Sequence, residues 1–224
     1  MSTINTWLHQ LFDGRCRFCH IPCSKQDICP ACKEDLPWIT AACYACGLPL
    51  ASGAVYCADC LSSPPPFTHT IAIWRYCDDI QRLIQAYKFE EDFAAGRLLA
   101  ELAAETLQQR QSLLDAPVIP MPIHPKRRRS RGFDHTHHLA KWMGCSVSGQ
   151  LLKRQRHTPP QSGLDAAARA KNLAQAFTLT ATPPKQVILF DDVLTTGAST
   201  REAAATLKAT GVERVECFVL ARAI

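Results

Sequence analysis

Four Cys-x-x-Cys pairs within 45 residues constrain the fold of this chain more than any other feature. Nine of its twelve cysteines fall between positions 16 and 60. They form two similar units, each with a proline three residues after its first pair and a spacer of 9 or 10 residues before its second. Tight turns that present thiolates at this spacing are typical of zinc ribbons. The expected metal ligands are Cys16, Cys19, Cys29, Cys32, Cys43, Cys46, Cys57 and Cys60.

A redox site or a set of disulfides explains these pairs less well. A thioredoxin-like site has one pair beside a βαβ pattern, and disulfides rarely persist in the cytoplasm. We therefore expect one or two structural Zn²⁺ ions. The repeat favours one ion in each unit, with an interleaved pairing of the four knuckles as the alternative. A closed site of four cysteines leaves no open position for catalysis, so the metal would supply folding energy instead.

Three successive prolines at 64–66 divide the chain, because such a segment forms a stiff extended connector. We expect an N-terminal zinc-ribbon module at residues 1–62, with a short helix at 5–12, and an α/β domain at 67–224. In the second part, alternating strands and helices predict a mostly parallel sheet with flanking helices. Strands are expected at 69–76, 117–123, 147–152, 176–179, 186–190 and 214–220, and helices at 78–87, 92–110, 134–143, 165–173 and 198–209.

The strand expected at 186–190 leads into the residues that carry the strongest chemical signal. It ends in two adjacent carboxylates, which suit ribose hydroxyls, Mg²⁺ or both. A turn rich in hydroxyl groups follows and opens a helix, where backbone N–H groups bind anions. The alternative to an anion-binding turn is an ordinary helix N-cap. The turn is not a Walker A phosphate loop, because no lysine follows the glycine. The expected site comprises Asp191, Asp192, Thr195, Thr196, Gly197, Ala198 and Ser199.

The positive charge of the chain is concentrated in one segment. The formal net charge is +5, yet residues 126–177 alone carry 11 basic and 2 acidic residues. A cluster of cations suits a highly anionic ligand or the backbone of a nucleic acid, with a solvated basic helix edge as the alternative. Phe133, His135 and Trp142 would offer stacking faces for single-stranded bases. The cluster, interpreted as a loop, comprises Lys126, Arg127, Arg128, Arg129 and Arg131.

Two other groups of residues have structural interpretations. His124, His135, His137 and His138 are interpreted as a surface cluster, with a metal-binding or acid–base role as the alternative. The segment 87–89, Tyr-Lys-Phe, is interpreted as a core tyrosine beside a surface lysine, with a base-stacking site as the alternative.

Residues 187–200 resemble the phosphoribosyl-pyrophosphate (PRPP) signature of type I phosphoribosyltransferases. With its other motifs the chain resembles the ComF family, competence-associated proteins in which a zinc ribbon precedes a phosphoribosyltransferase-like domain. The resemblance covers roughly residues 14–223. Asp134 and His135 depart from the family's Asn-Gln, and Ser199 replaces its usual Thr. The supporting motifs are the cysteine knuckles, Tyr87-Lys88-Phe89, Pro120-Met-Pro-Ile-His124, Arg128-x2-Arg131-Gly132-Phe133, Arg154-x-Arg156-His-Thr-Pro-Pro-Gln161, Arg169-x2-Asn172 and Ala176-Phe177.

The resemblance implies a type I phosphoribosyltransferase-like fold and a role for each motif. Asp191 and Asp192 would hold the ribose hydroxyls of PRPP, which binds with Mg²⁺, and the turn 195–199 would hold its 5-phosphate. The basic loop would bind pyrophosphate, close to the negative charge of Asp134. A mobile flap would close over the ligand with Arg154, Arg156, Gln161 and Arg169.

These features lead to two hypotheses for function. The first is a ComF-like factor of natural transformation that handles incoming single-stranded DNA and carries a PRPP site. Its partners would be PRPP, single-stranded DNA, and DNA-uptake or recombination proteins. The second is an active phosphoribosyltransferase that transfers ribose 5-phosphate to a nucleobase or an amine; the acceptor and the oligomeric state are not specified by the sequence. No apolar run approaches the ~20 residues of a membrane span, and no signal peptide is visible, so we expect a cytoplasmic protein without membrane insertion.

Overall fold

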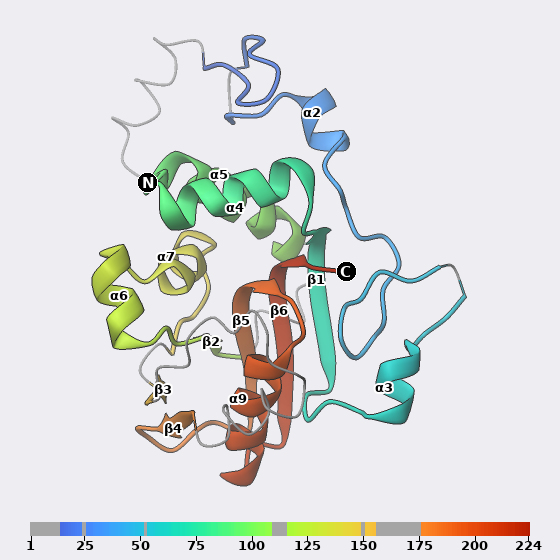
Figure 1. The fold of residues 1–224 in the computed structure, drawn as a ribbon, viewed down its shortest axis with the longest axis vertical. Coiled ribbons are helices and arrows are strands. Elements are labelled where there is room, and N and C mark those ends of the chain that lie inside the picture. The colour runs from blue at the N-terminus through green and yellow to red at the C-terminus, as the bar shows by residue number, and fades with distance from the viewer. Residues whose placement is uncertain (1–13, 24–25, 52, 109–115, 149–150, 156–175) are drawn as a thin grey trace.

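The computed structural model of the chain describes residues 14–23, 26–51, 53–108, 116–148, 151–155 and 176–224, and only the backbone of 126–127 (Figure 1). The helices of these ranges are α2 (Pro30–Glu34), α3 (Ala58–Ser62), α4 (Asp78–Phe89), α5 (Phe93–Gln108), α6 (Pro125–Arg131), α7 (His135–Trp142) and α9 (Ala198–Ala209). The strands are β1 (His69–Arg75), β2 (Val118–Pro120), β3 (Leu152–Arg154), β4 (Phe177–Leu179), β5 (Gln186–Leu194) and β6 (Arg214–Arg222). Among the described residues, no helix is both long and apolar enough to cross a membrane.

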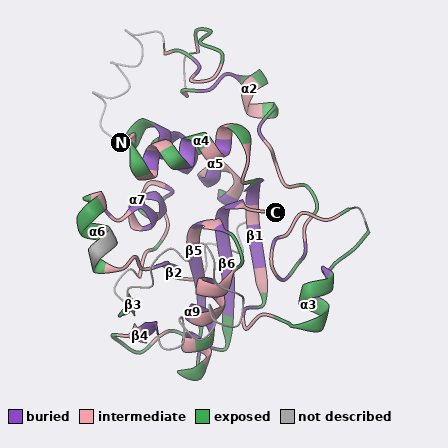
Figure 2. Ribbon diagram, in the orientation of Figure 1, coloured by how far each residue is buried: buried purple, intermediate pink, exposed green. Residues whose placement is uncertain are grey.

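Four parallel strands form the central sheet in the order β1-β6-β5-β2. β3 and β4 form a separate antiparallel pair. Alternate residues of β5 face opposite layers: Ile188 and Phe190 pack with the helices α4, α5 and α7, while Val187 and Leu189 pack with α9. Figure 2 shows the buried residues concentrated along these strands and on the inner sides of the helices. The expected mostly parallel sheet with flanking helices is thus confirmed.

The packing of α4 on α5 sets the position of the residues at the end of α4. A Cβ atom added at Gly96 of α5 would lie 2.4 Å from the Tyr87 ring, so only glycine allows this approach. The Tyr87 ring is buried, and its hydroxyl donates to the backbone carbonyl of His135 at 3.2 Å. The C-terminal end of α4 is therefore fixed against the start of α7, beside the end of β5.

The cysteine-rich region covers the free edge of β1. Trp38 pairs with Trp74 in an antiparallel bridge, and the two indole rings lie 5.3 Å apart. The Ile39 amide donates to the Ile73 carbonyl at 2.9 Å, and the Arg75 amide donates to the Pro37 carbonyl at the same distance. Covering an edge in this way satisfies backbone groups that would otherwise be open to pairing with another chain.

Ion pairs join the first cysteine unit to the helical layer. Arg17 pairs with Asp92, just before α5, and Lys33 of α2 pairs with Glu105 of α5 at 2.5 Å. Ile28 and Leu36 of this unit are buried within the same apolar core as α4 and α5. The division of the chain near residues 62–67 stays a prediction.

Several expected elements differ from the observed ones. The basic segment is the helix α6 and not a loop, because Pro125 is well placed at a helix start and arginine is a good helix former. β5 continues through both carboxylates to Leu194, since β6 pairs with it as far as Arg222. Of the strand expected at 147–152, the described residues show a bridge between Val147 and Val118 and the first residue of β3, Leu152. The helices expected at 5–12 and 165–173 lie outside the described residues.

Candidate functional site

Two groups of four thiols occupy the cysteine region. Cys16, Cys19, Cys29 and Cys32 form the first, and the second consists of Cys43, Cys46, Cys57 and Cys60; in each group all four sulfur atoms lie within 4.8 Å of one another. The pairing of knuckles within each unit is confirmed, and the interleaved alternative is wrong.

Both groups fit a structural zinc ion. A tetrahedral site with Zn–S bonds of about 2.3 Å separates its sulfur atoms by about 3.8 Å. The Cys19 and Cys29 sulfurs lie 3.6 Å apart, and those of Cys46 and Cys57 lie 3.7 Å apart. Cys23 belongs to neither group, and its thiol donates instead to the Gln26 carbonyl at 3.0 Å. Four sulfur ligands fill each site, so these ions would hold the backbone and not act in catalysis.

The two carboxylates of β5 have different surroundings. Asp192 is 3% exposed and forms an ion pair with Lys88 at the end of α4. Burial alone would raise its pKa, but the Lys88 ammonium and the neighbouring His135 lower the pKa of Asp192 below its usual range. Asp191 is half-buried, and burial together with the negative charge of Asp192 raises its pKa well above the usual value. The pair therefore divides into an ionised Asp192 and a carboxyl at Asp191 that retains its proton more readily.

His135 links the acid pair to the basic helix. It is 4% exposed, its Nε2 lies 3.5 Å from the Asp192 carboxylate, and Arg131 of α6 donates to its Nδ1 at 2.8 Å. Burial lowers the pKa of His135 to about 4, so the ring is neutral at pH 7. Because Nδ1 accepts from Arg131, the ring proton belongs on Nε2, facing Asp192. The expected surface position of His135 is therefore wrong.

This buried imidazole predicts a specific loss of stability in acid. The pKa of His135 is about 4 in the folded chain against a usual value of 6.5, so the unfolded chain binds more protons between these pH values. The free energy of unfolding should fall as the pH drops from 6.5 to 4, by up to about 3 kcal/mol from this residue. Denaturant unfolding of the His135→Gln variant should show a correspondingly weaker pH dependence. Parallel pH curves for the two proteins would contradict the burial of a neutral ring.

The turn after β5 has the features of an anion site. Gly197 adopts a left-handed conformation with φ of 73° and caps the N-terminus of α9. Thr195 and Thr196 are exposed, while Ala198 and Ser199 are half-buried in the first turn of the helix. The positive end of α9 and two exposed threonines thus lie within one short turn, where a phosphate group would be stabilised.

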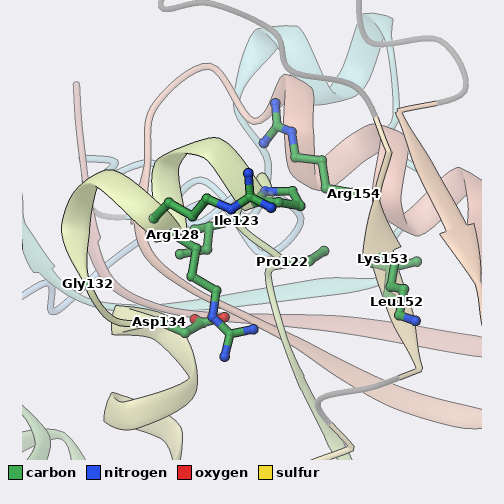
Figure 3. Close-up of a pocket in the computed structure, with 10 residues that line it drawn as sticks. Pro122, Ile123, Arg128, Gly132, Asp134, Leu152, Lys153 and Arg154 are labelled. Atoms are coloured by element: carbon green, nitrogen blue, oxygen red, sulfur yellow. The ribbon is translucent and has the colours of Figure 1, made fainter.

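A pocket of about 820 Å³ lies between α6 and β3. Figure 3 shows side chains of α6 on one side of it and those of Leu152, Lys153 and Arg154 on the other. Asp134 lines the same pocket, but its carboxylate caps α7 by accepting from the His137 amide at 3.1 Å. The Asp134 carboxylate therefore has a structural role at the start of α7. The pocket is lined by Pro122, Ile123, Pro125, Arg128, Arg129, Gly132, Asp134, Leu152, Lys153 and Arg154.

The structure brings only some of the residues predicted for the basic cluster and the flap together at this pocket. Arg128 and Arg129 are exposed on α6, whereas nothing is described of the side chains of 126–127. Of the expected flap, Arg154 lies on β3 with its guanidinium 5.5 Å from the centre of the Phe177 ring. Arg156, Gln161 and Arg169 lie outside the described residues.

Two interpretations of side chains near the site need correction. Lys88 is not a surface lysine, since its side chain is 17% exposed and pairs with Asp192. The only sequence feature that singles out Lys88 is the Tyr-Lys-Phe motif, and this motif does not indicate an ion pair with Asp192. Phe133 is 8% exposed and packs against the Tyr87 ring, so neither it nor His135 presents a free stacking face.

Comparisons with known proteins agree with this architecture. Residues 7–61 match the family described as double zinc ribbon domain. Competence protein F of Haemophilus influenzae is 31% identical, covering 95% of this chain and 98% of that protein. DNA utilization protein YhgH of Salmonella typhimurium is 32% identical over 94% and 98%. Competence protein ComFC of Streptococcus pneumoniae is 27% identical over 67% of each chain.

Among solved structures, orotate phosphoribosyltransferase from Aeropyrum pernix matches 65% of this chain and 66% of its own, with 20% identity and a TM-score of 0.34. The family assignment does not depend on that likeness. It depends on the relatives aligned over nearly their whole length and on the two cysteine clusters that the fold brings together. The chain belongs to the ComF family of competence proteins.

Proposed function

We propose that this chain is a cytoplasmic factor of DNA uptake that handles incoming single-stranded DNA and binds PRPP with Mg²⁺. The proposal rests on the carboxyl ends of the neighbouring strands β2 and β5. The connections that follow these two strands lead in opposite directions along the sheet. From β5 the chain passes through α9 to β6, whereas from β2 it passes through α6 and α7 to Val147, on the other side of β2. Ligands of open parallel sheets bind at such a switch point.

The residues at this point suit a ribose phosphate. Asp192 is engaged by Lys88, so Asp191 is the carboxyl that we assign to the ribose hydroxyls. The turn 195–199 supplies backbone N–H and hydroxyl donors for the 5-phosphate. Mg²⁺ is usually held by one or two carboxylates together with substrate phosphates, which suits Asp191 beside a bound diphosphate. Arg128 and Arg129 offer forked donors for that diphosphate.

The basic helix also suits a nucleic-acid backbone. Arg128 and Arg129 are exposed, and with Lys153 and Arg154 they surround one pocket. Such a surface binds phosphates without reading sequence, as a protein handling arbitrary incoming DNA requires. The printed names of the relatives, competence protein and DNA utilization protein, support a role with DNA. DNA-uptake or recombination proteins are the partners that we propose on the same basis.

Calorimetric titration of the zinc-loaded full chain with PRPP and Mg²⁺ tests the ligand site. We expect micromolar binding by the wild type and at least about tenfold weaker binding by Asp191→Asn, because the carboxylate acceptor of the ribose hydroxyls is lost. Lys185→Ala, at the opposite end of β5, is the control and should bind like the wild type. Equal binding by Asp191→Asn would refute the assignment. Pyrophosphate release on addition of a nucleobase or an amine would favour the active-transferase hypothesis.

Salt-dependent binding of a single-stranded oligonucleotide tests the DNA role. Removing two phosphate contacts in Arg128→Ala/Arg129→Ala should reduce the slope of log affinity against log salt by about 1.4. Lys185→Ala/Lys208→Ala removes the same charge near the amino-terminal ends of β5 and β6, opposite the proposed site, and should leave the slope unchanged. Identical slopes for the two double variants would exclude α6 as the DNA contact.

A further inference from the structure

We infer that Arg222 ties the second cysteine cluster to the anion-binding turn, so that metal at that cluster and ligand at the turn stabilise each other. The inference rests on the proposed function for its ligand, but its structural part stands on contacts alone. Arg222 is the last residue of β6, and it pairs in register with Leu194, the last residue of β5. Its side chain reaches both the cluster and the turn.

The first half of the tie is to the cysteine knuckle. The Nε atom of Arg222 donates to the Cys46 carbonyl at 3.1 Å. The preceding carbonyl, that of Ala45, accepts from the buried Thr70 hydroxyl at 2.6 Å. Gly47 then turns the chain with φ of 67°, and an added Cβ there would lie 3.0 Å from the Thr70 side chain. Thr70 of β1 and Arg222 of β6 thus bind the successive carbonyls of Ala45 and Cys46. These carbonyls belong to a turn that supplies two thiols of the second cluster.

The second half of the tie is to the end of β5. The Nη1 atom of Arg222 donates to the Thr195 carbonyl at 2.6 Å and to the Leu194 carbonyl at 3.1 Å. These carbonyls begin the turn that presents Thr195 to Ser199. By comparison, a side-chain bond within the turn is long: the Ala198 amide donates to the Thr196 hydroxyl at 3.5 Å. The Ala223 amide also donates to the Leu194 carbonyl, at 3.0 Å, and the Arg222 guanidinium adds the bond to Thr195 that holds the first residue of the turn.

The first cysteine cluster has different neighbours. Its unit is joined to the helical layer through the ion pairs of Arg17 with Asp92 and of Lys33 with Glu105. The two clusters therefore provide an internal comparison: metal at the second should respond to a ligand at the turn, and metal at the first should not. Thermodynamic linkage requires that any such effect be reciprocal.

Zinc release to a chromogenic chelator provides the first test. The two ions should leave the wild type in separable phases, and each phase is assigned from the variants Cys16→Ser/Cys19→Ser and Cys43→Ser/Cys46→Ser. PRPP with Mg²⁺ should slow release from the second cluster by about tenfold and leave the first unchanged. Provided that calorimetry shows PRPP bound to the wild type, equal protection of both clusters, or of neither, would overturn the inference.

Substitution of Arg222 provides the second test. Arg222→Lys keeps a positive charge but cannot bond carbonyls on both sides, and we expect it to weaken PRPP binding about tenfold and to accelerate zinc loss from the second cluster only. Arg214→Lys, at the other end of β6, is the matched control and should change neither property. Wild-type zinc release and PRPP binding by Arg222→Lys would overturn the inference while leaving the proposed function intact. If the wild type binds no PRPP, the proposed function fails, and zinc release by Arg222→Lys alone then decides whether the tie exists.

Discussion

Replacing Cys16 and Cys19 by serine is expected to remove about one zinc ion per chain and to unfold the first cysteine unit. Apart from Ile28 and Leu36, few of this unit's large apolar side chains are buried, so the metal must supply much of its folding energy. Structural zinc contributes an apparent ~10–16 kcal/mol at neutral pH, well beyond what a small apolar contact provides. Metal analysis by mass spectrometry measures the lost ion, and limited proteolysis should show new cleavage within residues 14–36.

The chain offers a matched control for this experiment. Cys23 lies between the two knuckles of the first unit but belongs to neither cluster. Cys23→Ser should therefore retain two zinc ions and the wild-type pattern of proteolysis. Cys43→Ser/Cys46→Ser should lose the other ion and leave the first unit protected. Retention of two ions by Cys16→Ser/Cys19→Ser would disprove the assigned ligands.

Truncating Asp192 to alanine should destabilise the chain by about 3–5 kcal/mol, because it leaves the Lys88 ammonium largely buried without its carboxylate. The cost should be largely recovered in Lys88→Met/Asp192→Ala, where both charges are removed and the apolar stem is kept. Chemical unfolding of the single and double variants forms a double-mutant cycle. Strictly additive effects would mean that the pair does not interact in solution.

This result would also affect how the ligand site is studied. Because Asp192 holds the end of α4 against β5, its variants would change stability and ligand binding together. Asp191 is half-buried, so Asp191→Asn separates the two effects. The two neighbouring acids, which look equivalent in the sequence, thus require different experiments.

The parts of the molecule that depend on local spacing could be predicted from the sequence. The thiol clusters follow from knuckles that close within a few residues, and the helix at 198–209 follows from its glycine cap and apolar period. The parts that depend on distant contacts could not. The pairing of Lys88 with Asp192 joins residues from opposite halves of the chain, and no local pattern indicates it.

Competition between local preference and tertiary contact explains the remaining differences. The apolar run ends at Phe190, so the strand is expected to end before Asp191, but hydrogen bonding to β6 extends β5 to Leu194. A histidine beside a run of arginines indicates a solvated surface. His135 is buried nevertheless, because Arg131 donates to its Nδ1 and its Nε2 lies 3.5 Å from the Asp192 carboxylate.

The edge of β1 covered by residues 37–39 has a consequence for the order of folding. Among the strands that the structure describes, β1 comes first in the chain and its partner in the sheet is β6, the last, so β1 has to wait for β6 to be synthesised. Pairings between distant segments form slowly and leave strands exposed to aggregation in the meantime. The segment that covers β1 precedes it in the chain and lies between the two metal-binding units. A nascent chain that has already bound its metal thus carries a partner for β1 before the C-terminal half exists.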